Sequence, residues 1–209
     1  VITVGHSLKR KKSVKIKKKE KPIELKRSLK NPILKPRDDK RWESEATFNP
    51  AAVKVGEEVH LLYRAVGDDG VSRIGHAESK DGINFDERSP FPVFFMDNPR
   101  RLSNPAIVHQ YSPVMYPSGG SWGGSEDPRV VNIEGTLYMT FNAFDGWDFI
   151  RIGVTSIKEK DFKEKKWTWT RTKLISPPGE VNKNWVLFPE KINGKFAILH
   201  SLSPEVQID

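Results

Sequence analysis

Short runs of alternating apolar and polar residues, separated by turns, make up most of the chain from about residue 32 onward. The apolar positions are mostly Val, Ile, Leu, Phe, Tyr and Trp, and the turns contain Gly, Asp, Asn and Pro. Such alternation is typical of β-strands with one buried face. No window of about 12 residues has an apolar period near 3.6 residues, so the sequence predicts an all-β fold with few, short helices.

Three stretches have the pattern of a β-hairpin, in which two strands flank a tight turn. The turns are centred on Gly56, on Glu134-Gly135 and on Asn193-Gly194. A glycine in such a turn adopts the positive φ angle that two-residue hairpins require. The chain is therefore expected to repeat one small unit.

Two further motifs recur at one common interval. Asn49-Pro50 is matched later in the chain by Asp127-Pro128, and Arg73-Ile74-Gly75 is matched at the same interval by Arg151-Ile152-Gly153. Two matches at one interval indicate an internal repeat. Each unit would run from the polar-Pro pair through a hairpin into a second pair of strands, which is the plan of a β-propeller blade. A β-sandwich with similar hairpins is the alternative fold.

The third unit begins near Phe188-Pro189, and the chain ends soon afterwards, at Asp209. This length holds about two and a half four-stranded blades, which cannot close a propeller. We therefore expect residues 31–209 to be the N-terminal part of a propeller domain that further sequence completes.

The formal net charge of +8 is concentrated in the first part of the chain. Residues 1–40 contain 15 of the 35 Lys and Arg residues but 4 of the 27 Asp and Glu residues, so residues 41–209 carry a net charge of −3. The basic stretch also lacks aromatic residues on which nucleic-acid bases could stack. We predict that residues 1–30 form a flexible, solvated arm and not a nucleic-acid site. Contact with nucleic acid, an acidic surface or a partner subunit is the alternative, and a homo-oligomer stays open.

The chain has no cysteine and no apolar stretch that approaches the roughly 18 residues needed to cross a bilayer. These features predict a protein without disulfides or membrane contacts, with the cytoplasm as the expected compartment. His6, His60, His76 and His109 have no ligand partners at metal-site spacing along the chain, so no metal site is predicted.

The densest cluster of polar residues is Gly123–Arg129, which contains Glu126, Asp127 and Arg129. The proline after Asp127 is expected to hold that residue extended and removes a competing donor. In a propeller this position would face the central channel, where a partly desolvated carboxyl can keep its proton and act as an acid. Asp-Pro is also a common turn, so both interpretations stay open from spacing alone.

Five motifs, in order along the chain, resemble the signatures of glycoside hydrolase family 130. They lie at residues 49–51, 62–65, 72–82, 124–129 and 187–195. The resemblance extends from about Asn31 to the end, and it implies a five-bladed propeller that cleaves β-mannosidic bonds. Most members with this pattern are phosphorylases, and some are hydrolases.

The resemblance implies a specific chemistry for Asp127. The family's acid protonates the glycosidic oxygen through a sugar hydroxyl, while inorganic phosphate attacks the anomeric carbon from the opposite face. Inversion then gives mannose 1-phosphate from a mannose-containing oligosaccharide. Phosphate is already an anionic nucleophile, so it needs a cationic site in place of a second carboxylate. Inorganic phosphate is thus a co-substrate, and no other cofactor is expected.

The remaining candidate residues are carried over from the same motifs. Residues expected to bind phosphate are Arg151, Lys191 and His200, and those expected to bind sugar or orient Asp127 are Asn49, Arg64, Glu126 and Arg129. The blade repeat alone would also explain Arg151, and the other arginines could form ion pairs between blades. Residues 91–122 depart from the family pattern, and loops of this kind determine substrate choice. A β-mannoside hydrolase and a non-catalytic carbohydrate-binding propeller are the alternative functions.

Overall fold

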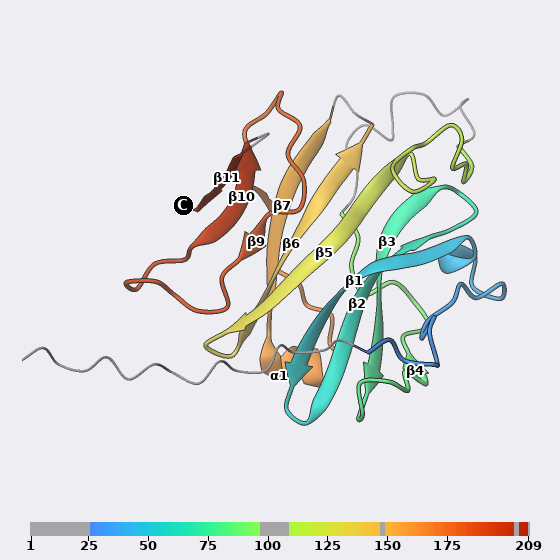
Figure 1. Cartoon of the computed structure of the whole chain (residues 1–209), viewed down its shortest axis with the longest axis horizontal. Helices are drawn as coiled ribbons and strands as arrows, with labels where there is room; N and C mark the ends of the chain where they lie inside the picture. The colour runs from blue at the N-terminus through green and yellow to red at the C-terminus, as the bar shows by residue number, and fades with distance from the viewer. Residues whose placement is uncertain (1–25, 97–108, 147–148, 203–204, 209) are drawn as a thin grey trace, which may run out of the picture.

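A computed structural model describes residues 26–96, 109–146, 149–202 and 205–208 of the chain. The flexible arm predicted for residues 1–30 lies almost entirely outside the described residues. Strands dominate the described part, as the sequence predicts (Figure 1). In chain order the elements are the 3₁₀-helix η1 (Arg41–Glu43), β1 (Ala46–Val55), β2 (Glu58–Val66), β3 (Val71–Ser79), β4 (Glu87–Arg88), β5 (Gly123–Ile133), β6 (Thr136–Asp145), β7 (Ile150–Lys158), α1 (Glu159–Lys163), β8 (Lys173–Leu174), β9 (Val186–Leu187), β10 (Ile198–Leu202) and β11 (Glu205–Ile208).

The first eight strands form two antiparallel units of four. Strands β1 to β4 pair in chain order, and β5 to β8 repeat that arrangement. A short parallel pairing of Val71 with Gly123 and of Ser72 with Gly124 joins β3 to β5. The two units are therefore continuous as an eight-stranded sheet.

The strand register confirms the internal repeat. Phe48 lies opposite Arg64 in the first unit, and Glu126 lies opposite Asn142 in the second. Both pairings then shift, between residues 48 and 51 and between residues 126 and 129. Each shift is a β-bulge that contains the polar-Pro pair, and a bulge is one of the few places where a strand tolerates proline.

The backbone at these bulges differs from the sequence prediction. Asn49 has a φ angle of 46° and Asp127 a φ angle of 49°. The extended conformation expected for Asp127 is therefore wrong, because the bulge turns its backbone into the left-handed region. Asn and Asp tolerate this region better than most residues.

The core lies between the two units. Leu62 and Ile74 of the first unit pack in one cluster with Leu137, Met139 and Phe141 of the second. The opposite face of the first unit, which includes Leu61 and Tyr63, is covered by residues 33–42. Strand β2 is therefore buried on both faces, and each large apolar side chain buried there contributes about 1.5–3 kcal/mol.

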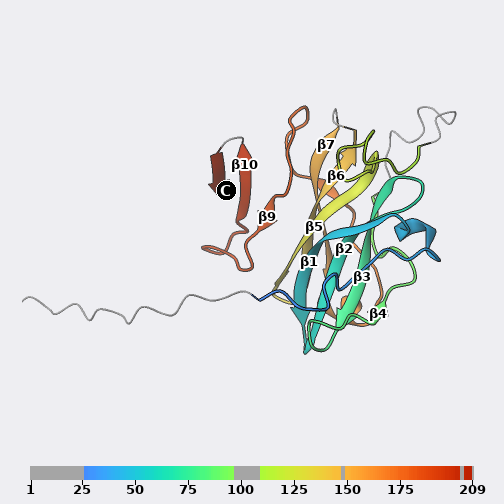
Figure 2. The same ribbon diagram turned by 45° about the vertical axis from the view of Figure 1, so that its right-hand side comes forward.

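A separate three-stranded sheet, in the order β11-β10-β9, follows the second unit. It stands beside β5 and β6 (Figure 2), which β9 contacts. The predicted turn is present, since Asn193 and Gly194 have φ angles of 51° and 75° and an Ile192–Lys195 bridge closes it. However, β9 ends at Leu187 and so precedes the Phe188-Pro189 pair near which the third unit was expected to begin.

The described residues thus form a mostly β structure built from repeated units, and they do not close into a ring. None of the described helices is long and apolar enough to cross a membrane.

Candidate active site

Asp127 lies at the bulge of β5 with 7% of its surface exposed. Its Oδ1 atom accepts hydrogen bonds from Asn49 Nδ2 at 2.8 Å and from Arg64 Nη1 at 3.3 Å. Its Oδ2 atom accepts one from Asn142 Nδ2 at 3.2 Å. The two polar-Pro bulges therefore meet, and residues from both units surround the predicted acid.

The amide of Asn142 is held in one orientation. Its Oδ1 atom accepts a hydrogen bond from the backbone N–H of Asn184 at 2.9 Å. A backbone N–H can only donate, so the amide nitrogen of Asn142 must face Asp127. Asn184, just before β9, thereby fixes one donor to the acid.

Arg64 joins Asp127 to its neighbour Glu126. The guanidinium donates from Nη2 to Glu126 Oε1 at 2.8 Å and from Nε to Ser72 Oγ at 2.9 Å, and it lies 4.7 Å from the centre of the Phe48 ring. The side chain of Arg64 is 2% exposed and that of Glu126 is fully buried. One buried cation therefore serves two adjacent carboxyl groups.

Glu126 has further partners from the loop before β5 and from the segment before β9. Its Oε1 accepts from Ser121 Oγ at 3.0 Å, and its Oε2 accepts from Ser118 Oγ at 2.9 Å and from Lys183 Nζ at 3.4 Å. Burial raises the pKa of Glu126, and the charges of Arg64 and Lys183 oppose that rise. Glu126 is linked to Asp127 through Arg64, which contacts both carboxyl groups.

Hydrogen-bond donors surround Asp127. All three of its partners in the described residues donate N–H groups. A carboxyl group that carries a proton donates its O–H, so it needs a hydrogen-bond acceptor beside it. Asn49 can supply one, because a half-turn of its amide would present Oδ1 to Asp127, whereas Asn184 prevents this in Asn142.

The residues expected to bind phosphate lie in other surroundings. Arg151 donates from Nη2 to the backbone carbonyl of Ser176. Lys191 Nζ contacts Glu134 Oε2 at 2.6 Å, at the β5–β6 turn. His200 is buried on β10 with its ring centre 4.7 Å from that of Trp185. The described contacts do not join Arg151 or Lys191 to Asp127, and the phosphate-binding roles stay predictions.

Among the residues expected to bind sugar, the structure brings Asn49, Arg64 and Glu126 to Asp127. Arg129 lies half-buried on β5, opposite Thr140. Sugar binding by these four residues stays a prediction.

Five residues of the cluster were not found from the sequence: Ser118, Ser121, Asn142, Lys183 and Asn184. Asn142 had a signal, because it follows Arg64 at the interval of the repeat. The two serines belong to the loop that the sequence linked to substrate choice alone.

Comparison with known proteins identifies the family. The family model described as beta-1,4-mannooligosaccharide phosphorylase, that of glycoside hydrolase family 130, matches residues 7–208. The chain belongs to glycoside hydrolase family 130. A 1,2-beta-oligomannan phosphorylase of Thermoanaerobacter sp. (strain X514) is 34% identical over 195 residues, which cover 89% of this chain and 56% of the relative.

Two more family 130 relatives carry related names. A beta-1,2-mannobiose phosphorylase of the same Thermoanaerobacter strain is 33% identical over 88% of this chain and 56% of the relative. A beta-1,4-mannooligosaccharide phosphorylase of Ruminococcus albus is 32% identical over 80% of this chain and 43% of the relative. The chain thus spans about half the length of the curated relatives that it matches.

Solved structures support the fold. A glycosyl hydrolase from Bacteroides ovatus aligns with a TM-score of 0.62 at 23% identity, over 84% of this chain and 52% of that chain. A beta-1,2-mannobiose phosphorylase from Listeria innocua aligns with a TM-score of 0.56 at 21% identity, over 87% of this chain and 61% of that chain. At these identities the likeness shows the fold alone.

Proposed function

We propose that the full-length protein is an inverting glycoside phosphorylase, which cleaves β-mannosides with inorganic phosphate and releases mannose 1-phosphate. Family 130 membership and the names of its phosphorylase relatives support the reaction class. The observation that carries the proposal is the meeting of two bulges at Asp127, where Asn49 and Arg64 contact its carboxyl. The repeated four-stranded units support a five-bladed propeller as the complete fold.

In this reaction a phosphate oxygen forms a bond to the anomeric carbon as the bond from that carbon to the glycosidic oxygen breaks. Asp127 supplies the proton that the departing oxygen takes up, through a sugar hydroxyl. The attack inverts the anomeric centre, so a β-mannoside gives the α-phosphate. Before the proton is transferred, Asn49 Oδ1 is proposed to accept a hydrogen bond from the protonated carboxyl of Asp127.

The buried neighbours of Asp127 have a positioning role in this proposal. Arg64 contacts both carboxyl groups, and its other donors are taken by Ser72, Ser118 and Ser121. Arg64 and Glu126 would therefore orient the acid, while Asn49 and Arg129 reach sugar hydroxyls.

Arg151, Lys191 and His200 are proposed to bind phosphate. The ion pair of Lys191 with Glu134 is partly exposed, with side-chain exposures of 30% and 70%. Exposed pairs contribute only about 0–1 kcal/mol, so Lys191 can exchange Glu134 for phosphate at little cost. Lys191→Ala is expected to weaken phosphate binding most and leave sugar binding near normal.

Hydrolysis is the less favoured function on this site. An inverting hydrolase places its acid and base about 6.5–9.5 Å apart so that a water fits between them. Glu126 is adjacent to Asp127 and shares Arg64 with it, so it is poorly placed to activate water. A non-catalytic sugar-binding propeller would have no need of a buried acid at this position.

The test is to incubate the full-length protein with β-1,2- and β-1,4-mannobiose, with and without inorganic phosphate, and to measure mannose 1-phosphate. We expect cleavage only with phosphate, and one mannose 1-phosphate for each bond broken. Release of free mannose alone at the same rate without phosphate would contradict phosphorolysis. Absence of cleavage together with saturable mannoside binding would point to the non-catalytic alternative.

A further inference from the structure

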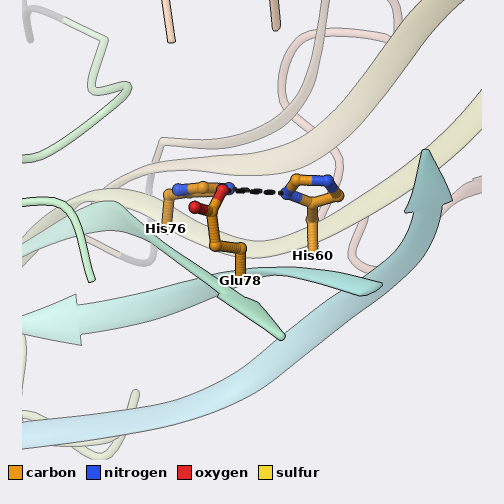
Figure 3. A group of neighbouring side chains, drawn as sticks. All are labelled: His60, His76 and Glu78. Atoms are coloured by element: carbon orange, nitrogen blue, oxygen red, sulfur yellow. Dashed lines mark hydrogen bonds and ion pairs between the residues drawn. The ribbon is translucent and has the colours of Figure 1, made fainter. Parts of the chain in front are cut away.

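Two histidines and a glutamate gather on one face of β2 and β3, away from Asp127. His60 on β2 lies directly opposite Glu78 on β3, and His76 precedes Glu78 by two positions on the same face. Figure 3 shows the three side chains pointing toward one another. The sequence argument against a metal site considered spacing along the chain, whereas strand pairing brings these residues together.

We propose that His60, His76 and Glu78 form a binding site for a divalent zinc-like ion. His60 Nδ1 and His76 Nε2 are 3.0 Å apart, and Glu78 Oε2 is 3.8 Å from His60 Nδ1. The potential ligand atoms all lie within 4.8 Å of one another. Ligand atoms around a tetrahedral zinc, at about 2.0–2.1 Å from it, are about 3.3 Å apart. Small side-chain shifts would therefore place the three groups at three corners of a tetrahedron, with water as the fourth ligand.

The histidines are buried and face each other. Both are 2% exposed. Neutral imidazole is the form that binds metal ions. In the present arrangement the two facing nitrogens share a hydrogen bond, and a bound ion would take its place.

A cavity of about 300 Å³ borders the site at Glu78. It is lined by Glu78 together with Glu58, Asp81, Asp86 and Glu87, and Lys80 is the cation in its wall. Five carboxyl groups attract cations to this opening. Imidazole and carboxylate ligands together favour zinc over calcium or magnesium, which prefer sites built from oxygen atoms alone.

The charge of Lys165 opposes binding of the proposed ion. Lys165 Nζ contacts Glu78 Oε1 at 2.6 Å, which leaves Oε2 to face His60. Its positive charge lowers the affinity for a metal, and it also holds the carboxylate in place. Phe162 and Trp167 close the remaining side with their rings against His76, at centroid distances of 5.6 and 4.9 Å.

The position of the cluster points to a structural role. Phe162 belongs to α1, which follows β7 of the second unit, and its ring also packs on His60 at 5.1 Å. A bound ion would therefore join β2 to β3 beneath the helix of the second unit. His60 stands four residues from Arg64 on β2, or about 13 Å along the strand, so the ion would stabilise the fold without reaching the acid.

The experiment is metal titration of untagged full-length protein that has been treated with a chelator. We expect one Zn²⁺ per chain by calorimetry, an absorption spectrum of a tetrahedral site with Co²⁺, and a higher melting temperature with Zn²⁺. His76→Gln and Glu78→Gln should each reduce Zn²⁺ affinity by more than the about 10- to 100-fold that loss of an outer partner costs. Lys165→Gln should tighten binding, because it removes the opposing charge.

His109→Gln is the matched control, since His109 stacks on Trp122 outside this cluster, and it should bind Zn²⁺ as the wild type does. Glu78 is 14% exposed, so Glu78→Gln remains informative if a histidine variant fails to fold. Absence of stoichiometric binding by the wild-type protein would overturn the proposal, as would binding that survives in Glu78→Gln and His76→Gln. None of these measurements depends on the proposed enzymatic activity.

Discussion

At the bulge of the first unit stands an amide, Asn49, and at the bulge of the second stands a carboxylic acid, Asp127. Both have left-handed backbones, with φ angles of 46° and 49°, and both precede a proline. Their side chains meet at 2.8 Å. The repeat thus explains the shared backbone, whereas the carboxyl group that we propose as the proton donor stands at this position in the second unit.

The second strands of the two units carry polar residues of different kinds at equivalent positions. Arg64 on β2 reaches forward to Asp127 of the second unit, and its equivalent Asn142 on β6 reaches forward to Asn184 before β9. Each unit therefore lends a polar side chain to the segment that follows it. The metal-site candidates have no such equivalents, since the matching positions of the second unit hold Tyr138, Val154 and Ser156.

The largest expected effect comes from exchanging the two bulge residues. Asp127→Asn keeps the shape of the bulge and removes the proton, so turnover of a β-mannobiose by the full-length protein should fall by about 10²–10⁴. The double variant Asn49→Asp/Asp127→Asn restores the carboxyl count but places the acid in the first unit. Activity should stay near that of Asp127→Asn, because small misplacements of a catalytic group cost about 10²-fold.

Two results would show that the bulges are not specialised in this way. One is recovery of near-native turnover by the double variant. The other is an equal loss in Asp127→Asn on a disaccharide and on an aryl mannoside. The aryl leaving group needs less protonation, so an acid role predicts a smaller loss on it.

The next effect concerns the difference between Arg64 and Asn142. Arg64→Met leaves Glu126 buried with Lys183 as its remaining cation, and breaking a buried ion pair costs about 3–5 kcal/mol. Asn142→Leu removes hydrogen bonds and should cost about 1–3 kcal/mol. Urea unfolding of the two variants measures both values. Arg64→Met/Glu126→Met should recover much of the loss, and equal costs at the two positions would contradict the buried pair.

Much of the fold could be predicted from the sequence because it depends on local signals. Glycines at the turns and alternating apolar residues indicate the hairpins, and the common interval between two pairs of motifs indicates the repeat. The left-handed backbone of Asp127 could not be predicted in this way. A proline in the next position normally favours an extended residue, and only pairing of β5 with β6 imposes the bulge.

The site was predicted less completely, because it depends on contacts between segments that are distant in the sequence. Asp127, Glu126 and Arg64 stood in recognisable motifs, but Ser118 and Lys183 reach Glu126 from segments without regular patterns. The histidine cluster was missed because His60 and His76 are 16 residues apart in sequence and become neighbours only when β2 pairs with β3. Side chains joined by strand pairing carry no signal in spacing along the chain.

The smallest expected effect tests how closely the two units match within the core. Gly75 lies opposite Tyr63, and Gly153 lies opposite Phe141, at the same positions of the repeat. A Cβ atom would lie 2.3 Å from the Tyr63 ring at Gly75 and 2.5 Å from the Phe141 ring at Gly153. Each glycine therefore makes room for the aromatic ring on the neighbouring strand.

Gly75→Ala and Gly153→Ala should each destabilise the protein by about 1–3 kcal/mol through overpacking, measured by urea unfolding. The cost should be larger at Gly75, because the hydroxyl of Tyr63 donates to Glu43 at 2.7 Å and accepts from Arg88 at 3.1 Å, which tethers the ring. Phe141 has no hydroxyl and can shift. In a Tyr63→Phe background the tether is lost, so Gly75→Ala should then cost the same as Gly153→Ala; a difference that persists would mean that the packing of the two units is not equivalent.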